Sequence, residues 1–215
     1  MNQRERIARR AAKELQDGYV VNLGIGMPTM VADYAPAGVR FTLQSENGIL
    51  GMGPAPAGKN GGNNIVNAGG NAVTVLSGAS FFDSATSFSI IRGGHVDLTI
   101  LGALQIDETG SLASHIIPGK MVPGMGGAMD LVTGSRKVVI TMMHAAKGGA
   151  PKILKKLTLP PTAVGKVNMI ITELAVIAVM GKGLKLIEIA HDVSVEDVKK
   201  LTEANLIVSD SLIRF

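Results

Sequence analysis

The sequence predicts an α/β protein built on an open, largely parallel sheet with flanking helices. Helix-type and strand-type patterns alternate along most of the 215 residues, as they do in α/β chains. Some expected strands, such as 138–140, are apolar at every position, which is typical of strands buried on both faces of a parallel sheet. Hydrophobic residues make up 46% of the chain and charged residues 18%, enough apolar material for a large core. Because we find no internal repeat and no long linker, we expect a single domain spanning 1–215.

The first half of the chain predicts the elements that lead to the centre of the sheet. An amphipathic helix is expected over 2–17, because apolar residues recur every four positions from Ile7 and Gly18 can cap its end. A long loop is expected over 51–70, which is rich in Gly and Asn. The other elements expected here are a strand at 19–23, a helix at 29–34 after Pro28, a strand at 39–44, a strand at 73–76, a helix or irregular segment at 83–92 and a strand at 98–101.

The second half continues the same alternation with longer connections. The stretch 119–134 is again rich in glycine, and 147–166 is basic and contains three prolines, so we expect the latter to be an exposed connection. A last helix is expected to start at Ser194, since Ser caps a helix and the acidic residues that follow suit its first turn. The strands expected in this half are 138–142, 169–172, 174–179 and 184–188.

Composition excludes several classes of function. The chain has no cysteine, so it can form no disulfide, thiolate metal site or cysteine nucleophile, and this fits a reducing, cytoplasmic setting. The formal charge is only +4 and aromatic residues are 3%, which argues against a nucleic-acid-binding surface. No apolar run is long enough to cross a membrane. The four histidines are scattered, so we expect no metal site.

Three turns are candidates for a ligand site, because ligands of open α/β sheets bind at the carboxyl ends of the strands. They are Asn22–Gly26, Ser45–Gly48 and Gly124–Ala128. In the first turn, Gly24 and Gly26 follow a strand, and Glu46 lies about 20 residues on, as in a dinucleotide-binding fingerprint. The third glycine of that fingerprint is missing, since Thr29 stands there. Three interpretations stay open: a nicotinamide cofactor, a purely structural turn, and backbone binding of another phosphate or acyl group.

The second turn holds an acid on a sharp bend. Asn47 and Gly48 tolerate positive φ, so the chain can reverse at once and leave Glu46 projecting. Taken alone, such a carboxylate is most simply a solvated turn residue.

The longer string Leu43–Pro54 resembles the signature of the small (β) subunit of type I coenzyme A transferases of 3-oxo acids. Further segments resemble the same family in the same order: 21–29, 67–70, 78–84, 91–97, 102–105 and 118–131. The resemblance therefore covers nearly the whole chain. It implies a fold of the kind shared by CoA-transferases and ribose-phosphate isomerases.

The resemblance also implies roles for particular residues. Glu46 is then the nucleophile that carries the acyl group as an anhydride and coenzyme A as a thioester. Gly127 is the oxyanion-hole glycine, with Gly126 beside it, and Asn22 contacts substrate. Gly24, Gly26, Ser45 and Asn47 lie in the same motifs, so we expect them at the substrate and CoA site. The resemblance makes coenzyme A a substrate, and it implies no resident cofactor.

The family pairs this subunit with an α subunit, usually as α2β2, and its substrates are acyl-CoA thioesters and short-chain carboxylates. Family members that use succinyl-CoA commonly carry Lys where this chain has Gly70, so we expect monocarboxylates such as acetate or butyrate, with acetoacetate as partner. Ser114–His115 replaces the family's Asn-Trp pair and affects the same pocket. The alternatives are a succinyl-CoA:3-oxoacid CoA-transferase subunit, a proton-transfer enzyme on a related sheet, and a non-catalytic acyl-CoA-binding partner.

Overall fold

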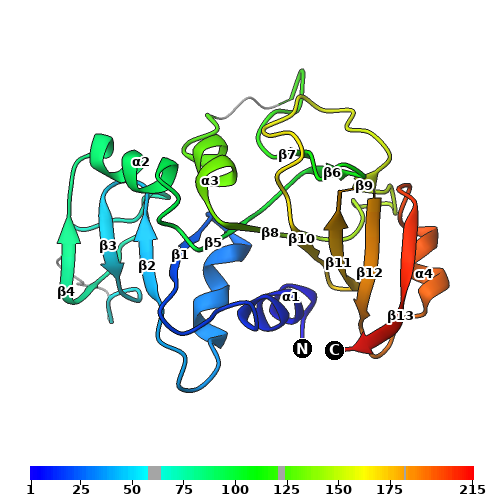
Figure 1. Cartoon of the computed structure of the whole chain (residues 1–215), viewed down its shortest axis with the longest axis horizontal. Coiled ribbons are helices and arrows are strands. Elements are labelled where there is room, and N and C mark those ends of the chain that lie inside the picture. Colours follow the sequence, from blue (N-terminus) through cyan, green and yellow to red (C-terminus); the bar gives the residue numbers. More distant parts are fainter. Residues whose placement is uncertain (58–63, 121–123, 182) are drawn as a thin grey trace.

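The computed structural model describes residues 1–57, 64–120, 124–181 and 183–215, and its centre is a mixed ten-stranded sheet (Figure 1). The strand order is β13-β12-β11-β10-β8-β5-β1-β2-β3-β4. The strands are β1 (Val20–Leu23), β2 (Thr42–Ser45), β3 (Ile49–Met52), β4 (Val75–Phe81), β5 (Leu98–Leu101), β8 (Lys137–Thr141), β10 (Met169–Ile171), β11 (Ala175–Met180), β12 (Gly183–Ile189) and β13 (Leu206–Arg214). Among these strands, five of the nine pairings are parallel, including all four in the central run β2-β1-β5-β8-β10. The predicted α/β class is confirmed.

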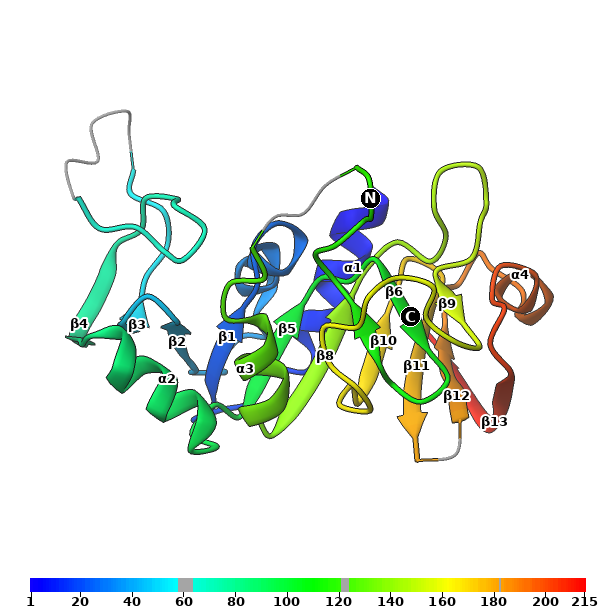
Figure 2. The ribbon, with the colours of Figure 1, turned by 90° about the horizontal axis from the view of Figure 1, so that it is seen from above.

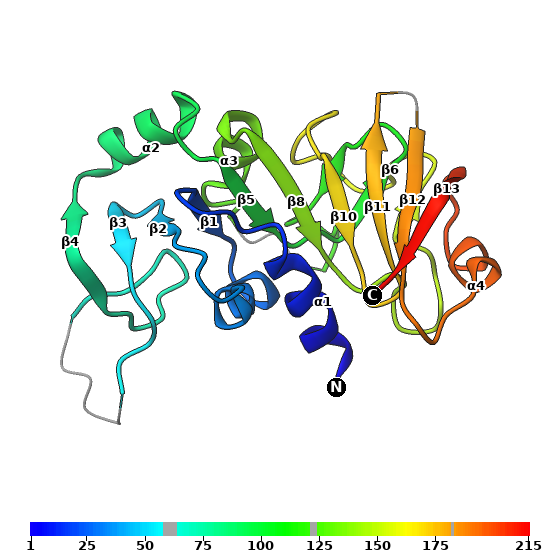
Figure 3. The same ribbon diagram turned by 60° about the horizontal axis from the view of Figure 1, so that its bottom comes forward.

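Helices cover both faces of this sheet. The helix α1 (Gln3–Ala12) and the 3-10 helix η1 (Met27–Tyr34) pack on one face, which Figure 3 brings forward. The helices α2 (Ser84–Arg92) and α3 (Ala128–Gly134) cover the other face, and Figure 2 shows them from above. The helix α4 (Val195–Lys200) lies beside β12 and β13 (Figure 1). Each face thus has its own apolar core.

A small three-stranded sheet adds to the core on the α3 side. Its order is β7-β6-β9, with β6 (Gln105–Asp107), β7 (Leu112–Ala113) and β9 (Ile153–Leu154). Ile106, Leu112 and Ile153 are fully buried in the same apolar cluster as Leu131 of α3. The expected exposed connection over 147–166 is therefore wrong at β9, where Ile153 enters this cluster and Leu154 is buried beside it.

The helix predicted over 2–17 ends earlier than its apolar repeat indicates. After Ala12 the backbone N–H groups of residues 13–15 bond three residues back instead of four, which tightens and ends the helix. Glu14 lies in this tight turn, and its carboxylate accepts from Arg10 of α1 and from Lys137 of β8 at 2.6 and 2.7 Å. A tertiary ion pair thus holds residues that the apolar repeat would place in a longer helix.

Several other elements begin or end at residues different from the predicted ones, because strand pairing sets their ends. The strand expected at 73–76 is β4, which starts at Val75 and runs to Phe81 as an edge strand along β3. The loop expected from residue 51 begins later, because β3 continues to Met52, and its residues 58–63 lie outside the described part of the chain. The 3-10 helix η1 starts at Met27, two residues before the expected helix. The strand β13 was not predicted. The strands β3, β6, β7 and β9 and the helix α3 were not predicted either, whereas the other predicted strands and the helices α2 and α4 are confirmed to within a few residues.

The order of the central strands creates a switch point at β1. Its parallel neighbours are β2 on one side and β5 on the other, and the chain builds the sheet outward in both directions from there. A crevice forms where the connections leave such a pair of strands in opposite directions, beyond their carboxyl ends. The described helices include none that could cross a bilayer. That the chain forms one domain over 1–215 stays a prediction.

Candidate active site

A cavity of about 1040 Å³ opens at this switch point. Leu23, Ser45 and Leu101 are the last residues of β1, β2 and β5, and all three line it. Most of its wall is apolar, and a few polar side chains face into it, among them Glu46 and Asp33. Of the described residues in the wall, none is Lys or Arg. A large apolar pocket with few polar groups at a switch point is the expected place for a ligand.

The hairpin between β2 and β3 presents Glu46 to this cavity. Ser45 pairs with Ile49 across the hairpin, so only residues 46–48 form the turn, and the Gly48 N–H donates to the Ser45 carbonyl at 2.9 Å. Gly48 has φ +109°, and a Cβ there would overlap the carbonyl oxygen of Phe82. Only glycine fits this position. The bend predicted at Glu46 is therefore present, and β4 holds it from the side.

The two oxygens of the Glu46 carboxylate have different neighbours. The Asn22 side-chain amide donates from Nδ2 to Oε2 at 3.4 Å. On the other side, a Cβ built on Gly127 would lie 3.2 Å from Oε1, so the Gly127 backbone packs directly against the carboxylate. The three turns that the sequence predicts as candidates therefore meet at one side chain. Glu46 itself is half-buried, which leaves it accessible from the cavity.

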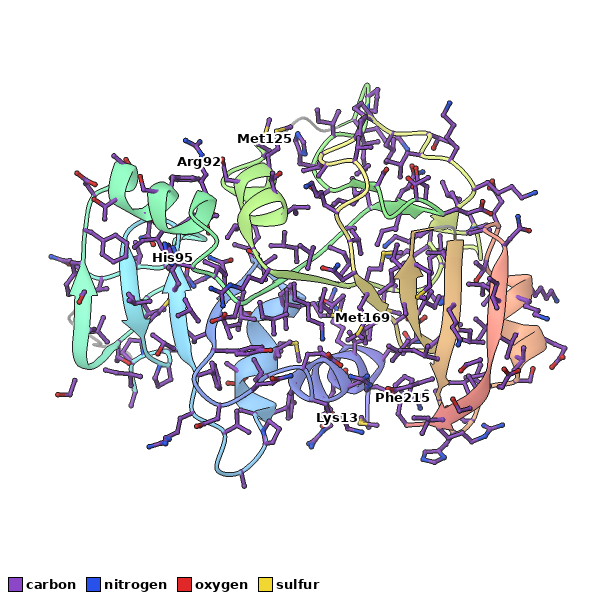
Figure 4. All side chains as sticks on the ribbon, in the orientation of Figure 1. Lys13, Arg92, His95, Met125, Met169 and Phe215 are labelled. Atoms are coloured by element: carbon purple, nitrogen blue, oxygen red, sulfur yellow. The ribbon has the colours of Figure 1, made fainter. Side chains whose placement is uncertain are left out.

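The third turn approaches closely because it has no side chains. Gly126 has φ +55°, and Gly127 immediately precedes α3. Within the described chain, neither backbone N–H of this pair donates a hydrogen bond. The helix is fastened to α2 by an ion pair of 2.7 Å between Arg92, labelled between the two helices in Figure 4, and Asp130. The turn can therefore offer N–H donors that are unpaired among the described residues, beside Glu46 and on a supported element.

Ser45 and Asn47 bind the chain that forms the cavity wall. The Ser45 hydroxyl accepts from the Ala68 N–H at 3.1 Å, and the Asn47 amide donates to the Val66 carbonyl at 2.8 Å. Ser45 lines the cavity, but Asn47 is exposed and lies outside its wall. Both side chains thus position the segment around Asn67, which does line the cavity.

The predicted glycines of the first turn lie at different depths. Gly24 lines the main cavity, where a Cβ would be 2.9 Å from the Leu101 side chain. Gly26 lies in a smaller adjoining pocket of about 270 Å³ and immediately precedes η1. Ser114 lines the main cavity, while Gly70 lies just outside its wall with open space around its Cα.

Sequence reasoning missed Gln44 and Ser87. Gln44 is 1% exposed and Ser87 is fully buried, and they link Asn22 to α2 through hydrogen bonds. No sequence signal marked Gln44, because it alternates with Leu43 and lies on the same side of the strand as Thr42, a pattern that indicates an exposed polar face. The described residues contain no cluster of three metal-binding side chains.

Comparison with known proteins identifies the family of this chain. The family described as coenzyme A transferase matches residues 4–201. The chain belongs to the coenzyme A transferase family. It is 55% identical to the beta chain of the acetate CoA-transferase of Escherichia coli K12 over 212 residues, which is 99% of this chain and 97% of that one. It is 49% identical to the corresponding chain of a probable succinyl-CoA:3-ketoacid coenzyme A transferase of Bacillus subtilis, covering 98% and 97%.

A solved structure shows the same architecture. An acyl-CoA transferase of Escherichia coli O157:H7 superposes with a TM-score of 0.78 at 26% identity, over all of this chain and 43% of that longer chain. The resemblance to the small subunits of CoA-transferases is thus confirmed, and the chain is part of a CoA-transferring enzyme. The interpretation of the first turn as a nicotinamide-binding fingerprint is not needed to explain its glycines.

Proposed function

We propose that this chain is the β subunit of an enzyme that transfers coenzyme A between an acyl-CoA and a short-chain carboxylic acid, through a thioester on Glu46. One observation carries the proposal: the Glu46 carboxylate stands at a large cavity between an amide donor, Asn22, and the bare backbone of Gly126–Gly127. A carboxylate is suited to this role because it can form an anhydride with the acyl group and a thioester with coenzyme A, both of which are activated toward the next nucleophile.

The reaction proceeds in matched steps. One Glu46 oxygen attacks the acyl-CoA carbonyl, and the C–S bond breaks to give an acyl-glutamyl anhydride and CoA thiolate. The thiolate attacks the Cδ of Glu46, which releases the first carboxylate and leaves a glutamyl-CoA thioester. The acceptor carboxylate then attacks this thioester, and the released thiolate attacks the new acyl carbonyl. Acyl-CoA leaves and the Glu46 carboxylate returns unchanged.

The two oxygens of the Glu46 carboxylate have different neighbours, and these indicate which role each oxygen has in the reaction. We infer that Oε1 is the attacking atom, since it lies against the backbone of Gly126–Gly127, whose N–H groups donate no hydrogen bond within the described chain and are available to stabilise the oxyanion on the incoming acyl group. Oε2 stays the glutamyl carbonyl oxygen and takes the negative charge when thiolate attacks Cδ, with Asn22 as its donor. Each such donor lowers the barrier by about 3 kcal/mol when it is aligned with the oxyanion.

The cavity supports monocarboxylate substrates, of the acetate, butyrate and acetoacetate kind. Its described wall carries two carboxylates, Glu46 and Asp33, and no cation, so a second substrate carboxylate has no counter-charge there. Gly70 adds none. The succinyl-CoA alternative is favoured by the names of relatives such as the Bacillus subtilis protein. Either activity belongs to short-chain fatty acid or ketone-body metabolism, which we place in the cytoplasm because the chain lacks cysteine.

We propose an α subunit as partner, in an α2β2 heterotetramer. The relatives are named as single subunits of their enzymes. Large apolar side chains are also exposed at the cavity, including Ile25 (70%), Leu76 (51%) and Met125 (39%). Apolar surface of this kind around a site is characteristic of a face that another subunit covers. The isolated chain is then expected to be inactive.

Trapping the covalent intermediate tests the proposal. The chain is copurified with its α subunit, incubated with acetoacetyl-CoA, and treated with borohydride or hydroxylamine. We expect peptide mass spectrometry to find modification at Glu46 alone. Glu46→Asp shortens the nucleophile by one methylene and is expected to slow turnover by orders of magnitude while CoA still binds. A proton-transfer enzyme or a mere CoA-binding protein gives no modified Glu46, and full exchange with Glu46→Ala contradicts the proposal outright.

A further inference from the structure

Gln44 is a buried polar residue at the interface between the sheet and α2. It is 1% exposed and pairs in register with Asn22 of the parallel strand β1, so both side chains are on the same face. Ser87 of α2, fully buried, packs over them, and its neighbour Ile91 on the same helix is fully buried too. Burying an amide costs free energy unless its polar atoms are paired; both ends of the Gln44 amide are paired, whereas Asn22 Oδ1 has no partner among the described residues.

These side chains form one hydrogen-bonded row that ends at Glu46. Asn22 Nδ2 donates to Gln44 Oε1 at 2.7 Å, which is its shortest contact. The other end of the Gln44 amide, Nε2, donates to the Ser87 hydroxyl at 3.1 Å. Asn22 Nδ2 also approaches the backbone oxygen of Gln44 at 3.2 Å and Glu46 Oε2 at 3.4 Å. The row thus runs from α2 through β2 and β1 to the carboxylate.

The row has one favourable direction. If the Asn22 amide were reversed, Oδ1 would face the Gln44 carbonyl oxygen and the Glu46 carboxylate, acceptor against acceptor. If the Gln44 amide alone were reversed, its Nε2 would face Asn22 Nδ2, donor against donor. The present arrangement pairs donor with acceptor at every contact and keeps the N–H of Asn22 on Glu46.

The contact between Asn22 and Glu46 is long in this resting state. A donor at 3.4 Å binds a carboxylate weakly, and such contacts tighten when charge develops in the reaction. Interactions that are stronger in the transition state than in the resting state are the ones that accelerate a reaction. Asn22 can act this way only if its side chain is held while the carboxylate changes, and its shortest bond is to Gln44.

We propose that Gln44 is a positioning residue that acts through Asn22, with Ser87 as its anchor on α2, and that it sets the rate at which coenzyme A is loaded on Glu46. The inference rests on the proposed function. Without the Gln44 amide, the strongest restraint on Asn22 is lost, and Nδ2 can turn fully toward the Gln44 backbone oxygen and away from Glu46.

The test measures single-turnover formation of the Glu46 thioester by the chain copurified with its α subunit, with acetoacetyl-CoA as donor. Gln44→Met removes the amide at similar volume and is expected to slow thioester formation and kcat about tenfold, with the acyl-CoA KM changed less than about twofold. Ser87→Ala is expected to slow it about threefold, since Gln44 itself stays. The matched control is Ser89→Ala on the exposed side of α2, which keeps the wild-type rate.

A double-mutant cycle separates positioning from general damage. If Gln44 acts through Asn22, adding Gln44→Met to Asn22→Ala slows the reaction no further. The proposal is wrong if the rate losses of Gln44→Met and Asn22→Ala multiply in the double variant. It is also wrong if Gln44→Met forms the thioester at the wild-type rate, or if only its KM changes. If Gln44→Met fails to fold, the Ser87→Ala and Asn22→Ala cycle decides in the same way. No thioester in the wild-type protein would instead refute the proposed function, whereas a thioester formed equally fast by both proteins refutes only the role of Gln44.

Discussion

The carboxylate of Glu46 lies against the backbone of Gly127, where a Cβ would be 3.2 Å from both Oε1 and Cδ. These residues are far apart in the sequence and are brought together by the hairpin after β2 and the turn before α3. The closeness excludes any side chain at Gly127 unless the carboxylate moves. This single contact makes the site testable by adding one methyl group.

Gly127→Ala is expected to displace Glu46 by a few tenths of an ångström. Because the reacting atoms need close alignment, we expect kcat to fall on the order of a hundredfold, with the free energy of unfolding lowered by less than about 1 kcal/mol. Steady-state kinetics and thermal unfolding measure the two effects. The control is Gly181→Ala, where a Cβ meets nothing within 4 Å. Wild-type kcat for Gly127→Ala contradicts the close packing.

Gly48→Ala is expected to damage the hairpin itself. The added Cβ overlaps the Phe82 carbonyl, and φ +109° is unfavourable for any other residue, so we expect a loss of about 3 kcal/mol or more in unfolding free energy, together with loss of activity. Gly38→Ala has φ +84° but open space, and is expected to cost only about 1 kcal/mol. Denaturant unfolding compares the two. Equal losses would mean that backbone conformation alone, and not the contact with Phe82, constrains the turn.

A cation at residue 70 is expected to change the choice of acid. Gly70→Lys has open space for the side chain, and φ +76° costs about 1 kcal/mol. A charge-assisted bond to a second substrate carboxylate is expected to raise the kcat/KM for succinyl-CoA relative to acetyl-CoA about tenfold. Gly70→Met carries the same backbone strain without the charge and serves as control. If wild type already prefers succinyl-CoA, the monocarboxylate proposal is wrong.

Buried Arg10 pairs with the partly buried Glu188 and so joins α1 to the sheet. Two bonds of 2.6 Å join them, and a third of 2.6 Å joins Arg10 to Glu14. The two carboxylates hold the pKa of Arg10 above its usual value despite burial, which lowers it. Arg10→Met leaves both carboxylates short of a partner and is expected to cost about 3 kcal/mol. Arg40→Met, at an exposed pair, is expected to cost less than about 1 kcal/mol, and an equal loss in both would contradict this role.

His144 is expected to make the protein acid-sensitive. Burial lowers its pKa from 6.5 to about 4, and the neutral ring bonds the hydroxyls of Thr172 and Thr202 at 2.9 and 2.8 Å. The unfolded chain binds the proton more readily between these values, so stability is full above pH 6.5 and falls by about 3 kcal/mol as the pH drops to 4.

Unfolding measured from pH 7 to pH 4 checks this dependence. His144→Gln cannot take up the proton, so its stability is expected to fall less steeply than that of wild type over the same range. Parallel slopes for wild type and His144→Gln would show that other groups cause the acid sensitivity.

The local sequence pattern was sufficient to predict an element wherever the residues that define it lie within that one segment. The capping box of Ser194 and Asp197 starts α4 as predicted, because both bonds lie within four residues. The apolar strand 98–101 is β5 to the residue. The helix over 2–17 was overextended, because the ion pair of Glu14 with Lys137 depends on a strand more than a hundred residues away.

The order and chemistry of the motifs, including the acid on its Asn-Gly bend and the glycine pair at 126–127, could be identified along the chain by itself, because each is a short string whose residue types are needed where they stand. Tertiary structure alone decided which oxygen of Glu46 meets which donor. It also decided that Gln44 and Ser87 are hydrogen-bonded in a row with Asn22. Those contacts join β1, β2, α2 and α3, and only parallel pairing and helix packing bring such distant segments within bonding range.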